Sequence, residues 1–239
     1  MRNIVILTGA GISAESGVPT FRGPDGLWEG HRIEDVATPQ AYRHDPVLVQ
    51  RFYDARRAAL ARVGPNAAHV ALARLDRDWP GEILIVTQNV DNFHERGAAG
   101  LGASAIHPAR LVHMHGELMS ALCGRCGASQ RWNGDLTGAP VCGCGGRLRP
   151  DIVWFGEMPY HMDRIDAAIA ACDLFVSIGT SGAVYPAAGF VDAARFAGAR
   201  TLELNLEPSA GTSLFDEARH GPASVLVPDW VDAILAANP

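Results

Sequence analysis

Residues 4–14 read IVILTGAGISA, an apolar run that leads directly into a glycine-rich turn. Such a run bounded by glycines is typical of a buried parallel strand. Gly9, Gly11 and Ala14 match the G-x-G-x-x-G/A fingerprint: the first permits the tight turn, the second lets backbone approach a pyrophosphate, and the third allows close helix packing. We expect free N–H groups at the start of the next helix to face the phosphates. NAD is therefore the first ligand to consider, and a glycine-rich turn without a ligand is the alternative.

The fingerprint lacks its usual second half. A Rossmann unit carries an acidic residue about 20 positions further on, at the end of a second strand, where it binds the ribose. Glu34 and Asp35 stand at that distance, but Pro24, Gly26 and Gly30 precede them and do not fit a helix followed by a strand. We therefore expect other residues to bind the ribose.

Length, charge and hydropathy limit the class of protein. The chain has 239 residues, of which 48% are hydrophobic, so it can fill a substantial core. Its net charge of −6 gives no basic field for a nucleic acid, and we expect no direct nucleic-acid binding. No apolar stretch approaches the roughly 20 residues of a membrane span, and no leader is evident. We expect a cytoplasmic protein that does not bind membranes.

Alternating strand and helix patterns predict an α/β fold, a Rossmann-like doubly wound parallel sheet with a smaller inserted domain. The expected strands are 4–7, 83–87, 174–178, 201–206 and 224–227, and the expected helices are about 46–62, 67–78, 162–171, 187–197 and 229–237. Residues 1–23, 66–116 and 149–239 are assigned to the larger domain, and residues 24–65 and 117–148 to the smaller one, with a helical part and a zinc-binding part.

Four cysteines form two close pairs, Cys123 with Cys126 and Cys142 with Cys144. Thiolates on two such tight turns can converge on one tetrahedral ion, which predicts a zinc ribbon with one structural zinc. Disulfides or unrelated buried thiols are the alternatives, and a reducing compartment disfavours the first. The fifth cysteine, Cys172, stands among alanines and is expected in the core.

Unusual polar residues follow three of the expected strands. Ligands bind beyond the carboxyl ends of the strands in such sheets, so these positions are candidates for a site. Each segment alone could be a helix cap, but together with the glycine-rich turn they favour one shared site. The segments are TQNVDNFH at 87–94, GTSG at 179–182 and NLEPS at 205–209.

Taken together, these motifs resemble the sirtuins, NAD-dependent protein lysine deacylases. The resemblance spans almost the whole chain in consistent order: GAGISAESGVPTFRG at 9–23, TQNVDNFHERGA at 87–98, HGE at 115–117, the cysteine pairs, WFGE at 154–157, GTS at 179–181 and NLEPS at 205–209. Within the family the chain most resembles the bacterial CobB type and the class that removes acidic acyl groups, whose signature is Tyr53-Asp54-Ala55-Arg56 with the small Ala37 upstream.

The resemblance implies a reaction that consumes NAD. The nicotinamide–ribose bond breaks while the acyl-lysine carbonyl oxygen attacks C1′, and the products are nicotinamide, O-acyl-ADP-ribose and free lysine. His115 is implied as the general base for a ribose hydroxyl, a task that suits its pKa range. Asn89 is implied to order the ribose and a water, Asp91 to hold the nicotinamide amide, and Gln88 to position His115. Phe21 is implied to shield the reacting sugar from water.

Alternation along the chain places His113 and His115 on one face, so from the residues alone either could be a structural histidine. The HGE motif selects His115. The resemblance also implies that Thr180, Ser181, Asn205 and Glu207 replace the missing ribose acid. The full NAD-binding set is Gly9, Ala10, Gly11, Glu15, Thr20, Phe21, Arg22, Trp28, Gln88, Asn89, Val90, Asp91, Gly179, Thr180, Ser181, Asn205, Leu206, Glu207 and Ala223.

The expected protein substrate carries an acylated lysine. Residues 153–157 are implied to wall its tunnel, and the substrate backbone to add as a strand between them and the loop at 182–185. On a helix Tyr53 and Arg56 share a face, so a hydroxyl and a planar guanidinium can bind a succinyl or malonyl carboxylate. A solvated Arg56, and core roles for the aromatic residues of the tunnel, are the alternatives. The expected substrate-binding set is Tyr53, Arg56, Ala37, Val153, Trp154, Phe155 and Gly156.

Two other functions compete with deacylation. A mono-ADP-ribosyltransferase shares the cleavage of NAD, and a non-catalytic module could sense NAD or recruit a partner through its zinc ribbon. The intact motifs around Asn89, Asp91 and His115 argue against both.

Overall fold

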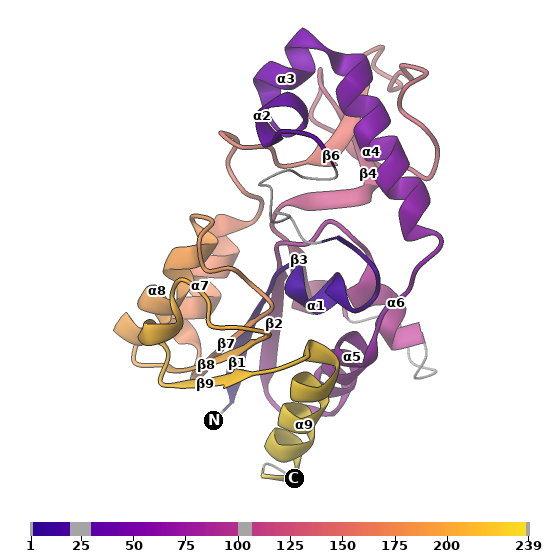
Figure 1. Ribbon diagram of the computed structural model, residues 1–239. Helices are drawn as coiled ribbons and strands as arrows, with labels where there is room; N and C mark the ends of the chain where they lie inside the picture. The colour runs from indigo at the N-terminus through magenta and orange to yellow at the C-terminus, as the bar shows by residue number, and fades with distance from the viewer. Residues whose placement is uncertain (1, 20–29, 100–106, 238–239) are drawn as a thin grey trace.

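The computed structural model describes residues 2–19, 30–99 and 107–237, which form two sheets (Figure 1). The larger is a parallel sheet in the order β3-β2-β1-β7-β8-β9. Its strands are β1 (Asn3–Thr8), β2 (Glu82–Thr87), β3 (Leu111–His113), β7 (Leu174–Ile178), β8 (Arg200–Asn205) and β9 (Glu217–His220). The strand order reverses between β1 and β7, and a ligand crevice is expected at such a switch point.

Helices cover both faces of the larger sheet, so the doubly wound fold is confirmed. Ile4 and Ile6 of β1 pack with α5 (Ala67–Asp78) and α9 (Ala223–Ala236), whereas Val5 and Leu7 pack with α7 (Met162–Ala171) and α8 (Phe190–Phe196). This alternation follows from the period of two in a strand. Figure 1 shows the two helix layers on opposite sides of the sheet. The remaining elements of this part are α1 (Gly11–Ala14), α6 (Phe93–Ala99), η1 (Pro108–Arg110), η2 (Ala187–Gly189) and η3 (Thr212–Leu214).

One predicted strand is wrong. Residues 224–227 belong to α9, and the helix expected at 229–237 is the continuation of the same element. Val227, Trp230, Val231 and Ile234 are buried at helical spacing, so packing on the core overrides the strand preference of the valines. Pro228 lies within the helix. The edge strand beside β8 is β9, whose four residues are all exposed and gave no apolar signal.

A smaller part lies beyond one end of the larger sheet (Figure 1). In the described residues it contains an antiparallel sheet in the order β5-β4-β6 and three helices. Phe52, Leu118 and Trp154 belong to one apolar cluster of this part, and a second, smaller cluster holds Ala121 and Leu148. The domain boundaries at residues 23, 65, 116 and 148 stay a prediction. The elements are α2 (Ile33–Val36), α3 (Pro39–His44), α4 (Pro46–Leu60), β4 (Gly116–Cys123), β5 (Ser129–Arg131) and β6 (Leu148–Ile152).

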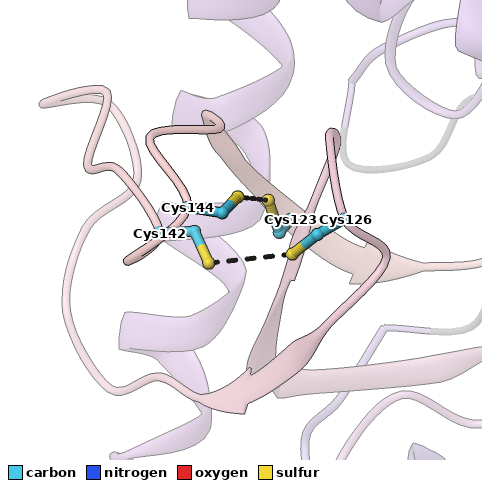
Figure 2. A group of neighbouring side chains, drawn as sticks. All are labelled: Cys123, Cys126, Cys142 and Cys144. Carbon is cyan, nitrogen blue, oxygen red and sulfur yellow. Dashed lines mark hydrogen bonds between the residues drawn. The ribbon is translucent and has the colours of Figure 1, made fainter.

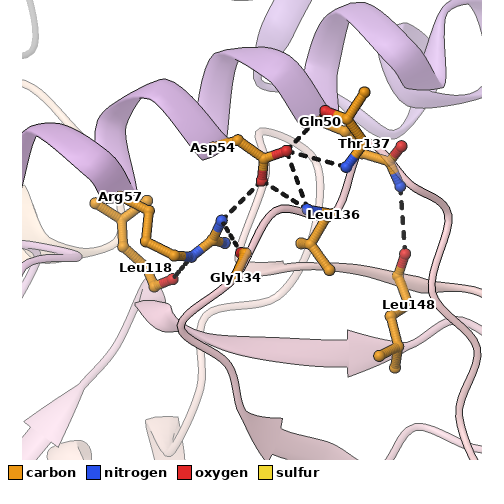
Figure 3. Close-up of polar contacts among 8 residues, drawn as sticks. All are labelled: Gln50, Asp54, Arg57, Leu118, Gly134, Leu136, Thr137 and Leu148. Atoms are coloured by element: carbon orange, nitrogen blue, oxygen red, sulfur yellow. Dashed lines mark hydrogen bonds and ion pairs between the residues drawn. The ribbon is translucent and has the colours of Figure 1, made fainter.

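Hydrogen bonds from a buried ion pair within α4 fasten this helix to the loop that follows β5 (Figure 3). Asp54 accepts hydrogen bonds from the backbone N–H groups of Leu136 and Thr137 and from the Thr137 hydroxyl, and Arg57 lies 2.8 Å from its Oδ1. Arg57 Nε also donates to the Leu118 carbonyl at 2.6 Å. Because a buried charge needs such partners, this network fixes the rotation of α4. Among the described residues, no helix is both long and apolar enough to cross a membrane.

Candidate active site

A cavity of about 930 Å³ opens at the carboxyl ends of the central strands, between the larger sheet and the smaller part. It lies at the switch point of β1 and β7. Thr20, Phe21, Arg22 and Trp28 lie outside the described residues. The other residues predicted to bind NAD or the substrate all line the cavity: Gly9, Ala10, Gly11, Glu15, Ala37, Tyr53, Arg56, Gln88, Asn89, Val90, Asp91, His115, Val153, Trp154, Phe155, Gly156, Gly179, Thr180, Ser181, Asn205, Leu206, Glu207 and Ala223.

The glycine-rich turn packs against the loop after β7. A Cβ on Gly11 would lie 2.7 Å from the Cα of Gly179, so this glycine allows two loops of the protein to approach. We expected the backbone N–H groups at the start of the helix after the turn to be free, but those of Gly11, Ile12 and Ser13 are not. Gly11 donates to the Gly179 carbonyl at 2.8 Å, and Ile12 and Ser13 donate to carbonyls within the turn. A short helix that closes its own first turn leaves fewer donors for a phosphate.

Asn89 and Asp91 are held by Ser13, a cavity residue that the sequence reasoning missed. The Asn89 amide nitrogen donates to the Gly9 carbonyl at 3.1 Å and lies 3.2 Å from Ser13 Oγ. Ser13 Oγ in turn donates to Asp91 Oδ2 at 2.9 Å. Burial raises the pKa of Asp91 above its usual value. The position of Ser13 in the sequence could have indicated its role, because it follows Gly11, the second glycine of the fingerprint, by two residues.

Two buried histidines lie beneath this group and were not predicted as part of the site. His94 Nε2 is 3.0 Å from Thr8 Oγ1, and His69 Nε2 is 3.4 Å from Ser13 Oγ. Burial lowers the pKa of both rings, to about 4 for His69. Both rings are therefore neutral, so His94 supports Thr8 and His69 supports Ser13 without adding charge.

The structure places His115 and His113 in different surroundings. His115 lines the cavity, and its Nδ1 lies 3.1 Å from the Gln88 carbonyl. Because a carbonyl only accepts, Nδ1 carries the hydrogen and Nε2 keeps its lone pair. Burial lowers the pKa of His115, which favours this neutral form.

His113 is satisfied within the fold and is not part of the cavity lining. Its Nε2 lies 2.9 Å from Glu95 Oε1, and its Nδ1 is 3.4 Å from the Asn89 carbonyl. Burial opposes a charge on the ring, but the hydrogen bond and charge of Glu95 outweigh it and raise the pKa of His113. The alternative of a structural histidine thus fits His113.

The loops after β7 and β8 meet at the far end of the cavity. Asn205 Nδ2 donates to the Thr180 carbonyl at 2.8 Å, which joins the two loops. Glu15 lines the same end, where its carboxylate accepts from the Ser224 backbone N–H at 2.8 Å and from the Ser224 hydroxyl at 2.7 Å. Glu15 therefore caps α9 beside Ala223, a contact that the sequence did not suggest.

The opposite end of the cavity brings together Ala37, Tyr53, Arg56 and Trp154. Tyr53 is fully buried, and its hydroxyl accepts a hydrogen bond from the Trp154 indole at 3.1 Å. Burial raises the pKa of Tyr53, so the phenol is neutral. Arg56 lies one helical turn further along α4, with its guanidinium carbon 5.6 Å from the Phe52 ring centroid. The Ala37 carbonyl accepts from the Phe155 N–H at 3.0 Å and closes the wall.

The four paired cysteines converge (Figure 2). Their sulfur atoms all lie within 4.8 Å of one another, and none of the cysteines in the described chain forms a disulfide. Backbone N–H groups of Cys126 and Arg125 lower the pKa of Cys123 to about 6, which favours the thiolate that a metal needs. Gly146 is required at the second turn, since a Cβ there would lie 2.6 Å from Cys123 Sγ. Four thiolates without an open position fit a structural zinc. Cys172 is buried in the core, as predicted.

Comparison with known proteins gives consistent matches over the whole chain. The family model described as "Sir2 family" matches residues 9–186. An NAD-dependent protein deacylase of Vibrio parahaemolyticus is 54% identical, with 99% of this chain and 97% of that protein covered. One from Yersinia pestis is 53% identical, with 97% and 82% covered.

Solved structures agree with the sequence matches. A Sir2 homologue in complex with NAD superposes with a TM-score of 0.87 at 36% identity, covering 98% of this chain and 90% of that one. A Sir2 protein with a deacetylated p53 peptide and 3′-O-acetyl ADP ribose gives a TM-score of 0.80 at 26% identity, covering 99% and 94%.

Proposed function

Because the chain belongs to the Sir2 family and is an NAD-dependent protein deacylase, we propose that it removes succinyl and malonyl groups as well as acetyl groups from lysine side chains. The observation that carries this proposal is the placement of Tyr53 and Arg56 on one wall of the cavity. The other described residues predicted to bind NAD or the substrate line the same cavity, so the reacting groups and the acyl group can meet there.

The chemistry of the wall suits an acidic acyl group. A carboxylate only accepts hydrogen bonds, and Arg56 offers a planar fork of donors while Tyr53 offers a hydroxyl. Both side chains line the cavity, Tyr53 buried and Arg56 half-buried, where a charge pair is screened less than in open water. Ala37 lines the same cavity and adds little volume, which leaves room for an acyl chain longer than acetyl.

The proposed catalytic roles follow from the protonation states. His115 Nε2 accepts the proton of a ribose hydroxyl, which then attacks the acyl carbon. Asn89 orders the ribose with its amide oxygen, because its amide nitrogen is occupied by Gly9 and Ser13. Asp91 holds the nicotinamide amide, and Gln88 positions His115 through its backbone carbonyl. The expected products are nicotinamide, O-acyl-ADP-ribose and free lysine.

The remaining NAD contacts belong to the same proposal. Thr180, Ser181, Asn205 and Glu207 bind the ribose in place of the missing strand acid, and Phe21, from outside the described residues, shields the reacting carbon. We also propose a cytoplasmic location, because four clustered cysteines without a disulfide are typical of a reducing compartment.

Replacing Arg56 with methionine tests the acyl range. We expect Arg56→Met to lower kcat/KM for a succinyl-lysine peptide by about 100-fold, the loss expected when a buried carboxylate keeps no cationic partner. The acetyl form of the same peptide has no carboxylate and should lose far less. The measurement is kcat/KM of both peptides with saturating NAD.

Arg51→Met is the matched control, because Arg51 is an exposed arginine on the same helix and does not line the cavity. Equal losses for the two peptides in Arg56→Met would remove Arg56 from acyl recognition. A wild-type protein that deacetylates but leaves succinyl and malonyl peptides intact would reject the proposed range.

A further inference from the structure

We propose that Trp154 is a positioning residue for acyl selectivity, because its indole N–H sets the direction of the Tyr53 hydroxyl hydrogen. The inference rests on the proposed function and goes beyond it: it concerns a residue that directs another side chain and itself needs no contact with the acyl carboxylate.

The direction of this hydrogen bond is fixed by chemistry. An indole nitrogen is a donor only, whereas a phenol hydroxyl can donate and accept. At a separation of 3.1 Å, Trp154 Nε1 therefore donates and Tyr53 Oη accepts. The Tyr53 hydrogen then points away from the indole. Since burial raises the pKa of Tyr53, the phenol keeps this hydrogen across the working pH range.

Contacts on several sides hold the Trp154 side chain in place, so its indole N–H has a fixed position and direction. The side chain is only 3% exposed, and the Arg149 guanidinium carbon lies 4.2 Å from the ring centroid. Glu157 accepts from Arg149 at 2.8 Å with one oxygen and from the Trp154 backbone N–H at 2.9 Å with the other. The Tyr42 ring packs at 5.1 Å. The ring therefore has little freedom to turn.

An oriented donor matters more for an acidic acyl group than for acetyl. A carboxylate can use the Tyr53 hydrogen, and donors that are fixed before binding cost less order on binding. Acetyl carries no acceptor at that depth. The contribution of Trp154 through Tyr53 should therefore show as a difference between the two substrates, whereas its contribution to the cavity wall is shared by both.

The test is the ratio of kcat/KM for succinyl and acetyl forms of one peptide in Trp154→Phe, which removes the N–H and keeps an apolar ring. We expect the ratio to fall about fivefold, as for a hydrogen bond worth ~1 kcal/mol, and to fall through KM of the succinyl peptide. A loss of folded protein changes both substrates equally and leaves the ratio unchanged.

Two further variants make the result decisive. In a Tyr53→Phe background, Trp154→Phe should lower the ratio no further, because the hydroxyl it orients is gone. Trp79→Phe is the matched control: its indole donates to the Arg2 carbonyl at 3.0 Å, away from the cavity, and the ratio should stay at the wild-type value.

The failures of the two proposals are distinguishable. If wild-type protein cleaves succinyl-lysine but Trp154→Phe keeps the wild-type ratio, or if its effect adds to that of Tyr53→Phe, only the orienting role is overturned. If wild-type protein leaves succinyl-lysine uncleaved, the proposed acyl range fails and the role of Trp154 falls with it.

Discussion

Replacing His115 with alanine is expected to lower kcat/KM for deacylation by about 10³-fold, within the range that a positioned general base contributes. The reason is the neutral ring: Nδ1 is committed to the Gln88 carbonyl, and Nε2 is the acceptor for a proton. Stability should change little, since the partly buried His115 makes one hydrogen bond to that carbonyl. The measurements are steady-state kinetics and a thermal melt of the same preparation.

The matched control is His113→Gln, two residues away. His113 is buried and paired with Glu95, so its replacement should lower the melting temperature and spare the chemistry of the folded fraction. The pH profile gives a second readout. Because burial lowers the pKa of His115 below 6.5, the acid limb of wild-type kcat/KM should have its midpoint below pH 6.5. Undiminished turnover in His115→Ala would show that the base is another group.

Removal of zinc is expected to unfold the smaller part of the protein. We expect one zinc per chain by metal analysis and a free energy of unfolding lowered by several kcal/mol after chelation, since structural zinc binds peptides with an apparent ~10–16 kcal/mol. The loop between the cysteine pairs carries Leu136 and Thr137, whose N–H groups satisfy Asp54 on α4. Its collapse removes these hydrogen bonds and leaves Asp54, one residue from Tyr53, with Arg57 as its partner within α4, so activity should fall as well.

Two cysteine variants separate the metal from other causes. Cys126→Ser should lose the zinc and reproduce the effect of chelation. Cys172→Ser should retain one zinc, because Cys172 lies in the core and outside the sulfur cluster. Metal-free protein with full stability would contradict a structural zinc.

Features with a strict local cause could be predicted from the sequence. The close approach of backbone at Gly9 and Gly11 leaves no room for a side chain, so the glycine-rich turn was predicted correctly. The spacing of the paired cysteines likewise led to a correct prediction of a four-cysteine cluster that fits a structural zinc. Helix α7 has the predicted bounds because a helical apolar pattern stands between turn residues. The polar residues that line the cavity could be assigned to one site from the sequence, because parallel strands end at a common edge of the sheet.

Features that depend on tertiary contacts could not be predicted. The valines before Pro228 favour a strand locally, but the apolar stripe of α9 packs on α5, and that gain decides the structure. The link between Glu15 and Ser224 joins residues more than two hundred positions apart. The hydrogen bond from Trp154 to Tyr53 likewise needs α4 and the segment after β6 to be placed first, so residue type alone could not reveal it.

The most direct test of the central claim is mass analysis of the products that wild-type protein forms from NAD and a succinyl-lysine peptide. The account predicts one nicotinamide and one O-succinyl-ADP-ribose for every lysine freed, with the acyl group transferred intact. Nicotinamide release with the peptide still succinylated, or ADP-ribose attached to the peptide, would contradict it.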